Sequence, residues 1–398
     1  MGLEKINDKR CILVIQHFTG IGGASLASLD VVSALLQMGE NVYLLLPGKD
    51  SPLADLAKCK GYNVVENCPP VINFTYHNAS SGIFRATIKW LKNIKYVERW
   101  KKIIEEFKPD VVVLNSGAQS PMINIVNSLN IRCICYVRET LRGNRNSIIN
   151  RWLKKKISRA WGIAFLTDFD KSSWSIENNN NQYILPDVVN SKHYSLSERK
   201  DNSDVFNVLY LGGFSYEKGA NDIIEAFQFV RNTKIKLFIL GDNGREILKL
   251  RGIKQLIYHK EAKSVKKAYK MINGINDLST QIKVEGIQNN VSRWYGMADA
   301  VVFPVKKVHQ ARPIYEAGWY GLPCVVPDYD NFKDVLIHEY NGLTYKKDNP
   351  HELADAILLL ADNRDLCRKL GENNKLMTEK NHSEFALQVK FQEMMYSE

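Results

Sequence analysis

The sequence feature that most constrains the fold is a repeated alternation of short β-rich runs with amphipathic helical stretches. The runs CILVI (11–15), NVYLLL (41–46), DVVVLN (110–115) and CICYV (133–137) have the length and composition of buried strands. Between the first two, residues 25–39 are apolar at helical spacing and end at Gly39, a suitable helix terminator. Strand, crossover helix and strand, repeated, predict a parallel sheet with helices on both faces.

A second series of the same kind begins after about residue 190. Strands are expected at 205–212, 236–241, 298–304 and 323–328, and helices at 221–230 and 351–362. The polar, Asn-rich stretch 178–204 between the two series predicts a partly ordered linker. We therefore expect an α/β fold of two doubly wound, Rossmann-like domains that face a central cleft. Their expected bounds are 1–190 and 191–375, followed by a terminal segment, 376–398.

Composition narrows the class of protein. The chain has 398 residues, 45% of them hydrophobic and 24% charged, which excludes a disordered or collagen-like chain. No apolar run approaches the roughly 20 residues of a membrane-spanning helix, and residues 1–15 do not resemble a signal peptide, so we expect a cytoplasmic protein. The seven cysteines lack metal-type spacing and predict free thiols. A net charge of +11 favours anionic partners.

Three loops carry the residues that suit an anionic ligand. The first strand is followed by Gly20-Ile21-Gly22-Gly23, which runs into a helix whose N-terminal N–H groups attract anions. This loop is neither a Walker-type phosphate loop nor a complete dinucleotide fingerprint, and a simple tight turn is the alternative. In the second series, the turn after residue 211 places Lys218 just ahead of a helix.

The third loop leads from the strand ending at Pro304 into a helix that includes 314–321. Pro313 suits a first helical turn, and Arg312 beside it would reinforce anion binding through its forked guanidinium. Glu316 would lie one turn further along, where it could accept hydrogen bonds from a sugar diol. The alternative for Arg312 is a salt bridge at the surface.

Together and in this order, the segments resemble glycosyltransferase family 4, also called group 1, which has the GT-B fold. The most specific match is YEAGWYGLPCVVPDYDNFKDVLIHEYNGLTY (315–345), and the segments at 217–219, 237–242 and 284–287 agree with the family pattern. The resemblance is strong over about 205–362 and diffuse before it. It implies a hexosyltransferase-type enzyme that uses a nucleoside diphosphate sugar, UDP- or GDP-linked, as donor, usually with retention and without a metal or other cofactor.

The resemblance also assigns roles. It implies an acceptor-binding first domain, a nucleotide-sugar-binding second domain and a terminal helix, 376–398, that crosses back to the first. Lys218 matches the lysine that binds the diphosphate, and Glu316 matches the second of two paired glutamates, which binds the ribose. The residues expected to catalyse are Lys218, Arg312, Glu316, Arg138 and Glu139. Those expected to bind the donor are Gly22, Gly23, Gly213, Gly241, Gly286, Ile287, Ala311, Pro313 and Ile314.

The sequence departs from the family pattern at three positions. The first of the paired glutamates falls at Val308, and the usual arginine ahead of the lysine falls at Gly213. We expect Arg312 to compensate for that missing arginine. A histidine often found after the fourth strand of the first domain aligns with Arg138, which Glu139 follows.

Two basic segments predict a further partner. Residues 84–102 hold seven basic residues, one acidic residue and four aromatic residues, and residues 145–159 hold six basic residues and no acidic one. Either these are solvated helix faces, or they contact an anionic membrane peripherally, which would suit a lipid-linked acceptor. Nucleic acid is not expected, because no nucleic-acid motif accompanies the charge.

The leading hypothesis is a glycosyltransferase that extends a surface polysaccharide, such as capsule, O-antigen or exopolysaccharide, on a glycan or lipid-linked acceptor at the inner face of the membrane. One alternative is a nucleotide-sugar epimerase of the same fold, for which Glu139 and His309 are the candidate acid and base. The other is a non-catalytic subunit that binds sugar nucleotides. An incomplete fingerprint disfavours a dinucleotide-dependent oxidoreductase.

Overall fold

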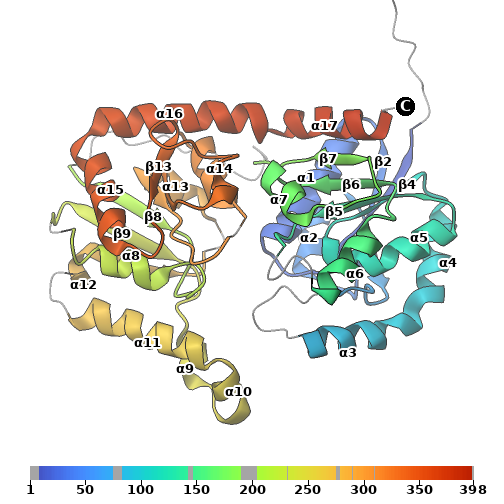
Figure 1. Cartoon of the computed structure of the whole chain (residues 1–398), viewed down its shortest axis with the longest axis horizontal. Helices are drawn as coiled ribbons and strands as arrows, with labels where there is room; N and C mark the ends of the chain where they lie inside the picture. Colours follow the sequence, from blue (N-terminus) through green and yellow to red (C-terminus); the bar gives the residue numbers. More distant parts are fainter. Residues whose placement is uncertain are drawn as a thin grey trace, which may run out of the picture. The chain divides into compact units, whose positions relative to one another are not determined.

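The computed structural model describes residues 9–74, 83–141, 147–189, 204–230, 232–274, 278–288, 290–308 and 310–396. The chain divides into two units (Figure 1). Unit 1 comprises Met1–Val188 and Glu384–Glu398, and unit 2 comprises Val189–Ser383. Each unit is built on its own parallel sheet with helices on both faces, so the expected two-domain α/β architecture is confirmed.

Unit 1 is organised around a parallel sheet in which β4 is central. In spatial order its strands are β3 (Asn63–Cys68), β2 (Asn41–Pro47), β1 (Cys11–Ile15), β4 (Val111–Leu114), β5 (Arg132–Val137), β6 (Gly162–Phe165) and β7 (Gln182–Ile184). Successive residues of a strand face opposite sides, so Leu13 and Ile15 enter one core while Ile12 and Val14 enter the other. Both faces are thus buried, which explains the uninterrupted apolar runs of the sequence.

Different helices cover the two faces of this sheet. The core around Ile12 and Val14 is closed by α1 (Gly23–Gln37), α2 (Pro52–Cys59) and α17 (Glu384–Tyr396). The opposite core is closed by α3 (Ile83–Asn93), α4 (Val97–Phe107), η2 (Gly117–Met122), α5 (Ile123–Ser128), α6 (Ile148–Ile157) and α7 (Asp168–Trp174). The single turn η1 (Ile94–Tyr96) joins α3 to α4. Figure 1 shows α4, α5 and α6 on the side of the sheet away from α17.

Unit 2 repeats this plan with a second parallel sheet. In spatial order its strands are β10 (Ile282–Gly286), β9 (Ile235–Leu240), β8 (Phe206–Tyr210), β11 (Ala300–Val302), β12 (Cys324–Pro327) and β13 (Gly342–Tyr345). One face packs on α8 (Ala220–Ala226), α11 (His259–Gly274), α12 (Leu278–Gln281), α15 (Pro350–Asp362) and α16 (Arg364–Asn381). The other packs on α13 (Ser292–Met297), α14 (Arg312–Trp319) and η3 (Asp330–Phe332).

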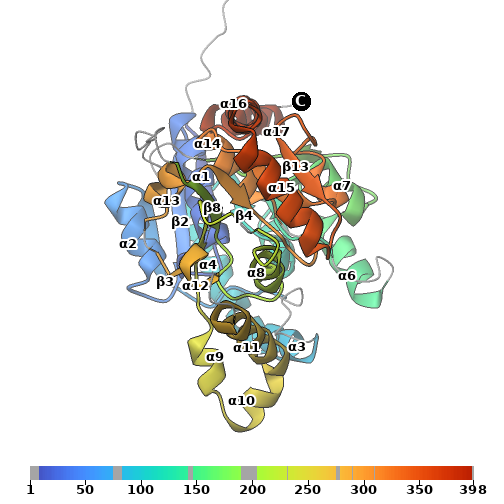
Figure 2. The same cartoon turned by 90° about the vertical axis from the view of Figure 1, so that its left-hand side faces the viewer.

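The short helices α9 (Arg245–Lys249) and α10 (Gly252–Ile257) precede α11, and both views place them at one end of unit 2 (Figures 1 and 2).

The stretch 178–204, expected as a partly ordered linker, contains β7 at Gln182–Ile184, the edge strand of the first sheet. One expectation about organisation needs correction. The expected terminal helix over 376–398 is instead the end of α16 and a separate α17, which begins at Glu384. α17 packs on α1 and β7, and its side chains Phe391 and Met394 are fully buried in the core of unit 1.

Within the described ranges, no helix combines the length and the apolar character needed to cross a membrane.

Candidate active site

The two loops that carry the predicted site residues flank the point where the strand order of unit 2 reverses. From β8 the chain winds outward through β9 and β10, then returns to add β11, β12 and β13 on the other side. Ligands of such sheets bind beyond the carboxyl ends of the strands at this switch point. The loop after β8 holds Lys218, and the loop after β11 leads into α14, which holds Arg312 and Glu316.

Glycines bring these loops into direct contact. Gly213 has a φ of +56°, and a Cβ there would lie 2.4 Å from the carbonyl oxygen of Asp242. Gly219 has a φ of +81°, and a Cβ there would lie 1.7 Å from the carbonyl oxygen of Pro304. A side chain at either position is therefore excluded both by backbone conformation and by space. The arginine that the family pattern has at position 213 could not be accommodated in this backbone.

Glu316 is a buried carboxylate held by two donors. It lies on the first turns of α14 with 8% of its surface exposed. Arg312 Nε donates to Oε1 at 2.7 Å, and the hydroxyl of Tyr295 donates to Oε2 at 2.7 Å. The structure therefore brings Arg312 and Glu316 together as an i,i+4 ion pair, with only 13% and 11% of the two side chains exposed. Arg312 forms a salt bridge, but the pair does not lie at the surface.

Lys218 lies close enough to the same carboxylate to respond to its charge. Burial lowers the pKa of Lys218, and the negative charge of Glu316 opposes that shift by raising it. Within the described residues no carboxylate forms an ion pair with Lys218. The backbone of Lys218 is fixed, because its carbonyl oxygen accepts a hydrogen bond of 3.1 Å from the hydroxyl of Tyr210 at the end of β8. A largely desolvated cation without a paired anion is costly, and it suits a site that receives an anionic ligand.

The other predicted donor-binding residues of unit 2 differ in their hydrogen bonds and in their exposure. Gly241 donates its N–H to the carbonyl oxygen of Gly286 at 2.8 Å, which links the loops after β9 and β10. Ile287 follows with 77% of its surface exposed.

Ala311 is the N-cap residue of α14, and Pro313 occupies its first turn. Ile314 is fully buried in the core, so that only its backbone remains for a ligand.

In unit 1, the glycine loop after β1 begins α1. Gly22 is the N-cap residue and Gly23 the first residue of the helix. The N–H groups of Ser25 and Leu26 both donate to the carbonyl oxygen of Gly22 at 3.0 Å. Gly22 has an extended backbone, and a Cβ there would lie 3.8 Å from the ring of Phe18, an ordinary van der Waals distance. Glycine at this position is therefore not required by the fold of unit 1 itself.

Arg138 and Glu139 follow β5 and are engaged within unit 1. Arg138 pairs through Nη1 with Asp187, donates from Nε to Asn115 Oδ1 at 2.8 Å and stacks on Tyr136 at 3.8 Å. The carboxylate of Glu139 accepts hydrogen bonds from the Ser116 hydroxyl and from the N–H of Gly117 at 2.8 Å.

These contacts tie the loops after β4 and β5 together, and they favour positioning roles over direct catalysis for both residues. The remaining candidate, His309, lies outside the described residues.

Tyr295 is the site residue that sequence reasoning missed. It lies on α13, is fully buried and stacks on Tyr320 with ring centroids 5.0 Å apart. It is 21 residues from Glu316 in sequence, so no local spacing signals their contact. The only available signal was the apolar run around it, which predicts burial but not the partner of its hydroxyl.

No group of three or more His, Cys, Asp or Glu side chains that could hold a metal ion occurs in the described part of the chain.

Comparison with known proteins agrees with this geometry. Residues 196–377 match the sequence model of the glycosyl transferases group 1. An uncharacterized glycosyltransferase of Methanocaldococcus jannaschii is 24% identical over 177 residues, a match that spans only 43% of this chain and 43% of that relative.

Two solved structures superpose over nearly the whole chain. The Anabaena protein HepE, solved with UDP and glucose, has a TM-score of 0.75 and 15% identity over 97% of this chain and 99% of its own. A glycosyltransferase from Rickettsia africae has a TM-score of 0.76 and 15% identity over 98% of this chain and 100% of its own. The fold is therefore GT-B, and the findings together support a group 1 glycosyltransferase.

Proposed function

We propose that this chain transfers a sugar from a nucleoside diphosphate sugar, UDP- or GDP-linked, to a glycan or lipid-linked acceptor. The observation that carries the proposal is the state of Lys218, a cation that burial has largely removed from water and that no carboxylate of the described residues pairs with. A diphosphate supplies the missing anion. The match of residues 196–377 to group 1 glycosyltransferases supports this assignment of the ligand.

Lys218 contributes to catalysis through the leaving group. When the bond between the sugar and the diphosphate breaks, negative charge accumulates on the diphosphate oxygens. A cation that is already fixed and desolvated stabilises this charge more in the transition state than in the ground state. The hydrogen bond from Tyr210 to the backbone of Lys218 and the tight turn at Gly219 hold the cation in place before the donor binds.

Glu316 binds the ribose of the donor, and Arg312 and Tyr295 position its carboxylate. The hydroxyl of Tyr295 and Nε of Arg312 each lie 2.7 Å from the Glu316 oxygen to which they donate, so the carboxylate is oriented in the free protein. A carboxylate oxygen can accept more than one hydrogen bond, and a ribose diol can therefore be added without breaking these contacts. Arg312 also adds positive charge beside the diphosphate position, which is the role that the sequence predicts for it.

The remaining features of the reaction follow from the resemblance to the family. The transfer retains the configuration at the anomeric carbon and requires no metal, with Lys218 and Arg312 as the positive groups. Unit 1 binds the acceptor, and its loop at Gly22 and Gly23 takes part in binding the donor. We place the reaction in surface-polysaccharide biosynthesis, with peripheral contact of unit 1 to an anionic membrane at its inner face.

The alternative of an epimerase gains no support from the described residues, because Glu139 is already bonded through both carboxylate oxygens.

Incubation with radiolabelled UDP- and GDP-sugars, followed by separation of donor, free sugar, epimer and extended acceptor, tests the function. Sugar transfer to an acceptor, or slow transfer to water with release of nucleoside diphosphate, is expected. Accumulation of an epimeric sugar nucleotide would replace the proposal with the epimerase. Tight binding of the donor without any turnover would identify a non-catalytic subunit.

A further inference from the structure

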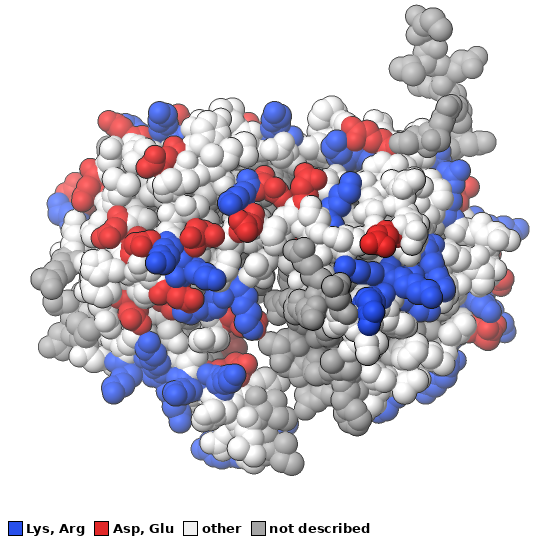
Figure 3. Space-filling model, viewed as in Figure 1, with Lys and Arg blue, Asp and Glu red and all other residues white. Residues whose placement is uncertain are grey.

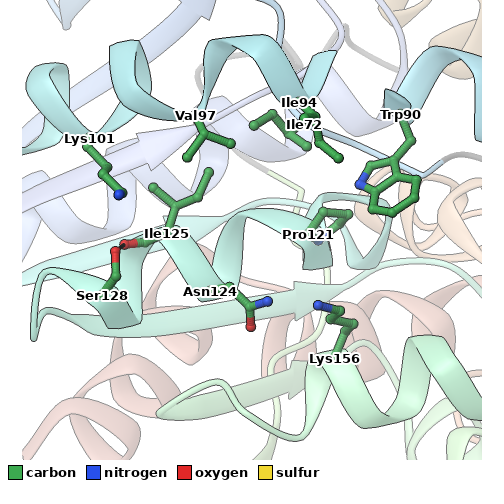
Figure 4. A pocket seen from close by; sticks show the side chains of 10 residues that line it. All are labelled: Ile72, Trp90, Ile94, Val97, Lys101, Pro121, Asn124, Ile125, Ser128 and Lys156. Atoms are coloured by element: carbon green, nitrogen blue, oxygen red, sulfur yellow. Dashed lines mark hydrogen bonds between the residues drawn. The ribbon is translucent and has the colours of Figure 1, made fainter. Parts of the chain in front are cut away.

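Unit 1 contains a groove of about 310 Å³ that the transfer reaction does not use. Its walls are apolar side chains from the stretch after β3 and from α3, η1, α4, η2 and α5, namely Ile72, Trp90, Ile94, Val97, Pro121 and Ile125. This volume equals the share of roughly ten water molecules in the liquid. Figure 4 shows these side chains facing one another, with Lys101 toward one end and Trp90 and Lys156 toward the other.

The groove lies where the two basic segments of the sequence meet. Trp90 of α3 and Trp152 of α6 form an edge-to-face pair with centroids 5.7 Å apart, and Phe74 packs on Trp152 at 5.2 Å. The described parts of the two segments, 86–102 and 147–159, therefore form one surface and not two separate helix faces. This surface also exposes apolar groups, since Ile94 at the edge of the groove is 42% exposed and Leu91 is 55% exposed.

Lys156 differs from the other cation that lines the groove. Lys101 is neutralised by Glu98 at 2.9 Å. Lys156 forms no ion pair with a carboxylate of the described residues and lies over the ring of Trp152 at 5.9 Å. Burial, and then the charge of Arg159, lower the pKa of Lys156, as expected for a cation that lacks an anion.

The helix dipole does not account for the whole basic surface. Lys154, Lys155 and Lys156 occupy the last turn of α6, where cations stabilise the partial negative charge of the helix end. They nevertheless point into different surroundings: Lys156 lines the apolar groove, while Lys154 and Lys155 line a second, polar hollow of about 390 Å³ with Arg151. Figure 3 shows basic side chains gathered over α6 on this face.

We propose that the groove binds a hydrocarbon chain that carries a phosphate group, with the chain against Trp90 and Ile125 and the phosphate at Lys156. The apolar walls bury the chain, and the phosphate supplies the anion that Lys156 lacks. The occupant is a membrane phospholipid, because the groove opens on a basic surface that also exposes Ile94 and Leu91. This binding goes beyond the sugar transfer, and a lipid-linked substrate is the other outcome of the test.

Calorimetric titration with dodecyl phosphate below its critical micelle concentration tests the site. Saturable binding at one site is expected, and each methylene added from octyl to dodecyl phosphate should tighten it by up to about fourfold. Because no sugar transfer is measured, a failure here is distinguishable from a failure of the proposed function. Inorganic phosphate is the control for charge alone, and equal binding of it would overturn the proposal.

Three variants separate the groove from general surface charge. Lys156→Gln should weaken binding by about tenfold, as expected for loss of one charge-assisted contact. Lys155→Gln removes the same charge from the same helical turn but lines the other hollow, so its binding should equal that of the unaltered protein. Ser128→Trp, at an exposed position on the rim, should block the chain.

Equal losses in Lys155→Gln and Lys156→Gln, full binding in Ser128→Trp, or no saturable binding at all would overturn the proposal. Competition identifies the source of the ligand once binding is found. Vesicles of phosphatidylcholine with phosphatidylglycerol, but not phosphatidylcholine alone, compete if the groove takes a bilayer lipid. A lack of competition from either vesicle would overturn the assignment to a membrane phospholipid and leave a lipid-linked substrate as the occupant.

Discussion

Arg312 Nε donates to Glu316 Oε1 at 2.7 Å, and this ion pair spans one turn at the start of α14 with both side chains largely buried. The pair gives Arg312 a second role beside the one predicted from the sequence. It orients the carboxylate that is proposed to bind the ribose, and it holds a positive charge one turn nearer the N-terminus of the helix, where a diphosphate would lie.

Arg312→Ala should destabilise the protein by about 2 kcal/mol, because it leaves a buried carboxylate without its charged donor. It should also lower turnover. Arg312→Lys should restore only part of the stability and part of the turnover, because a lysine lacks the forked guanidinium. Urea unfolding and steady-state kinetics measure the two effects. Exposed ion pairs contribute about 0.5 kcal/mol to stability. A loss no larger than this would contradict the argument that the pair is buried.

Tyr295→Phe should weaken the binding of free nucleoside diphosphate several-fold and lower the stability by about 1 kcal/mol. The reason is that Glu316 Oε2 loses the hydroxyl that donates to it. Tyr269→Phe is the matched control, since the Tyr269 hydroxyl donates to the carbonyl oxygen of Asn243 at 3.2 Å and not to Glu316. If calorimetry gives the two variants the same nucleotide affinity, Tyr295 does not position the carboxylate.

Gly213→Ala and Gly252→Ala form a matched pair that measures the contact between the loops after β8 and β9. Both glycines have similar backbone conformations, with φ values of +56° and +59°. A Cβ at residue 213 meets the backbone of Asp242, whereas a Cβ at residue 252 meets nothing within 4 Å. Gly252→Ala should therefore cost about 1 kcal/mol of strain.

Gly213→Ala should cost clearly more than this strain alone, because the clash with backbone is added to it. Urea unfolding of the two variants gives the comparison directly. Equal losses would mean that the two loops can move apart and that the contact at Asp242 does not fix the site.

The stability of the protein should fall between pH 6.5 and pH 4 because of His17. Burial, and then the charge of Lys89, lower the pKa of His17 to about 4. Over this range the unfolded chain binds a proton that the folded protein does not, so acidification favours unfolding. The full contribution, present above pH 6.5, is about 3 kcal/mol and is lost as the pH falls to 4.

His17→Phe should remove this part of the pH dependence. Urea midpoints at pH 7 and pH 4.5 for the protein and the variant check the prediction. An identical loss of stability in both would assign the pH dependence to other groups.

The sequence predicts the sheets well because local apolar runs determine buried parallel strands. Every strand expected from such a run is present, within a few residues of its predicted bounds. Five strands were not predicted, namely β3, β6, β7, β10 and β13. For β7 the reason is that a three-residue edge strand inside an Asn-rich stretch has no periodic signal. Lys218 and Glu316 were both expected in one site, and the charge of Glu316 does act on Lys218.

The contacts that could not be predicted are those between segments far apart in the chain. The spacing of residues along the chain predicts neither the hydrogen bond from Tyr295 to Glu316 nor the ring contact between Trp90 and Trp152. The sequence leaves two partners open for the Arg312 guanidinium, a carboxylate and a bound diphosphate, and the structure shows the carboxylate of Glu316. Sequence spacing places Arg312 and Glu316 on one face of a helix, but it does not decide between these partners.

The central claim is that Lys218 is the cation for the donor's diphosphate, and calorimetric titration with UDP, GDP and the corresponding nucleosides tests it most directly. The account predicts that one of the two nucleoside diphosphates binds well and its nucleoside weakly. Lys218→Ala should lower the affinity for that nucleoside diphosphate by about a hundredfold and leave the affinity for the nucleoside unchanged. Lys307 is an exposed lysine that pairs with Glu217 at 3.2 Å. The control variant Lys307→Ala should bind the nucleoside diphosphate with the affinity of the unaltered protein. Undiminished nucleoside diphosphate affinity in a folded Lys218→Ala variant would contradict the account.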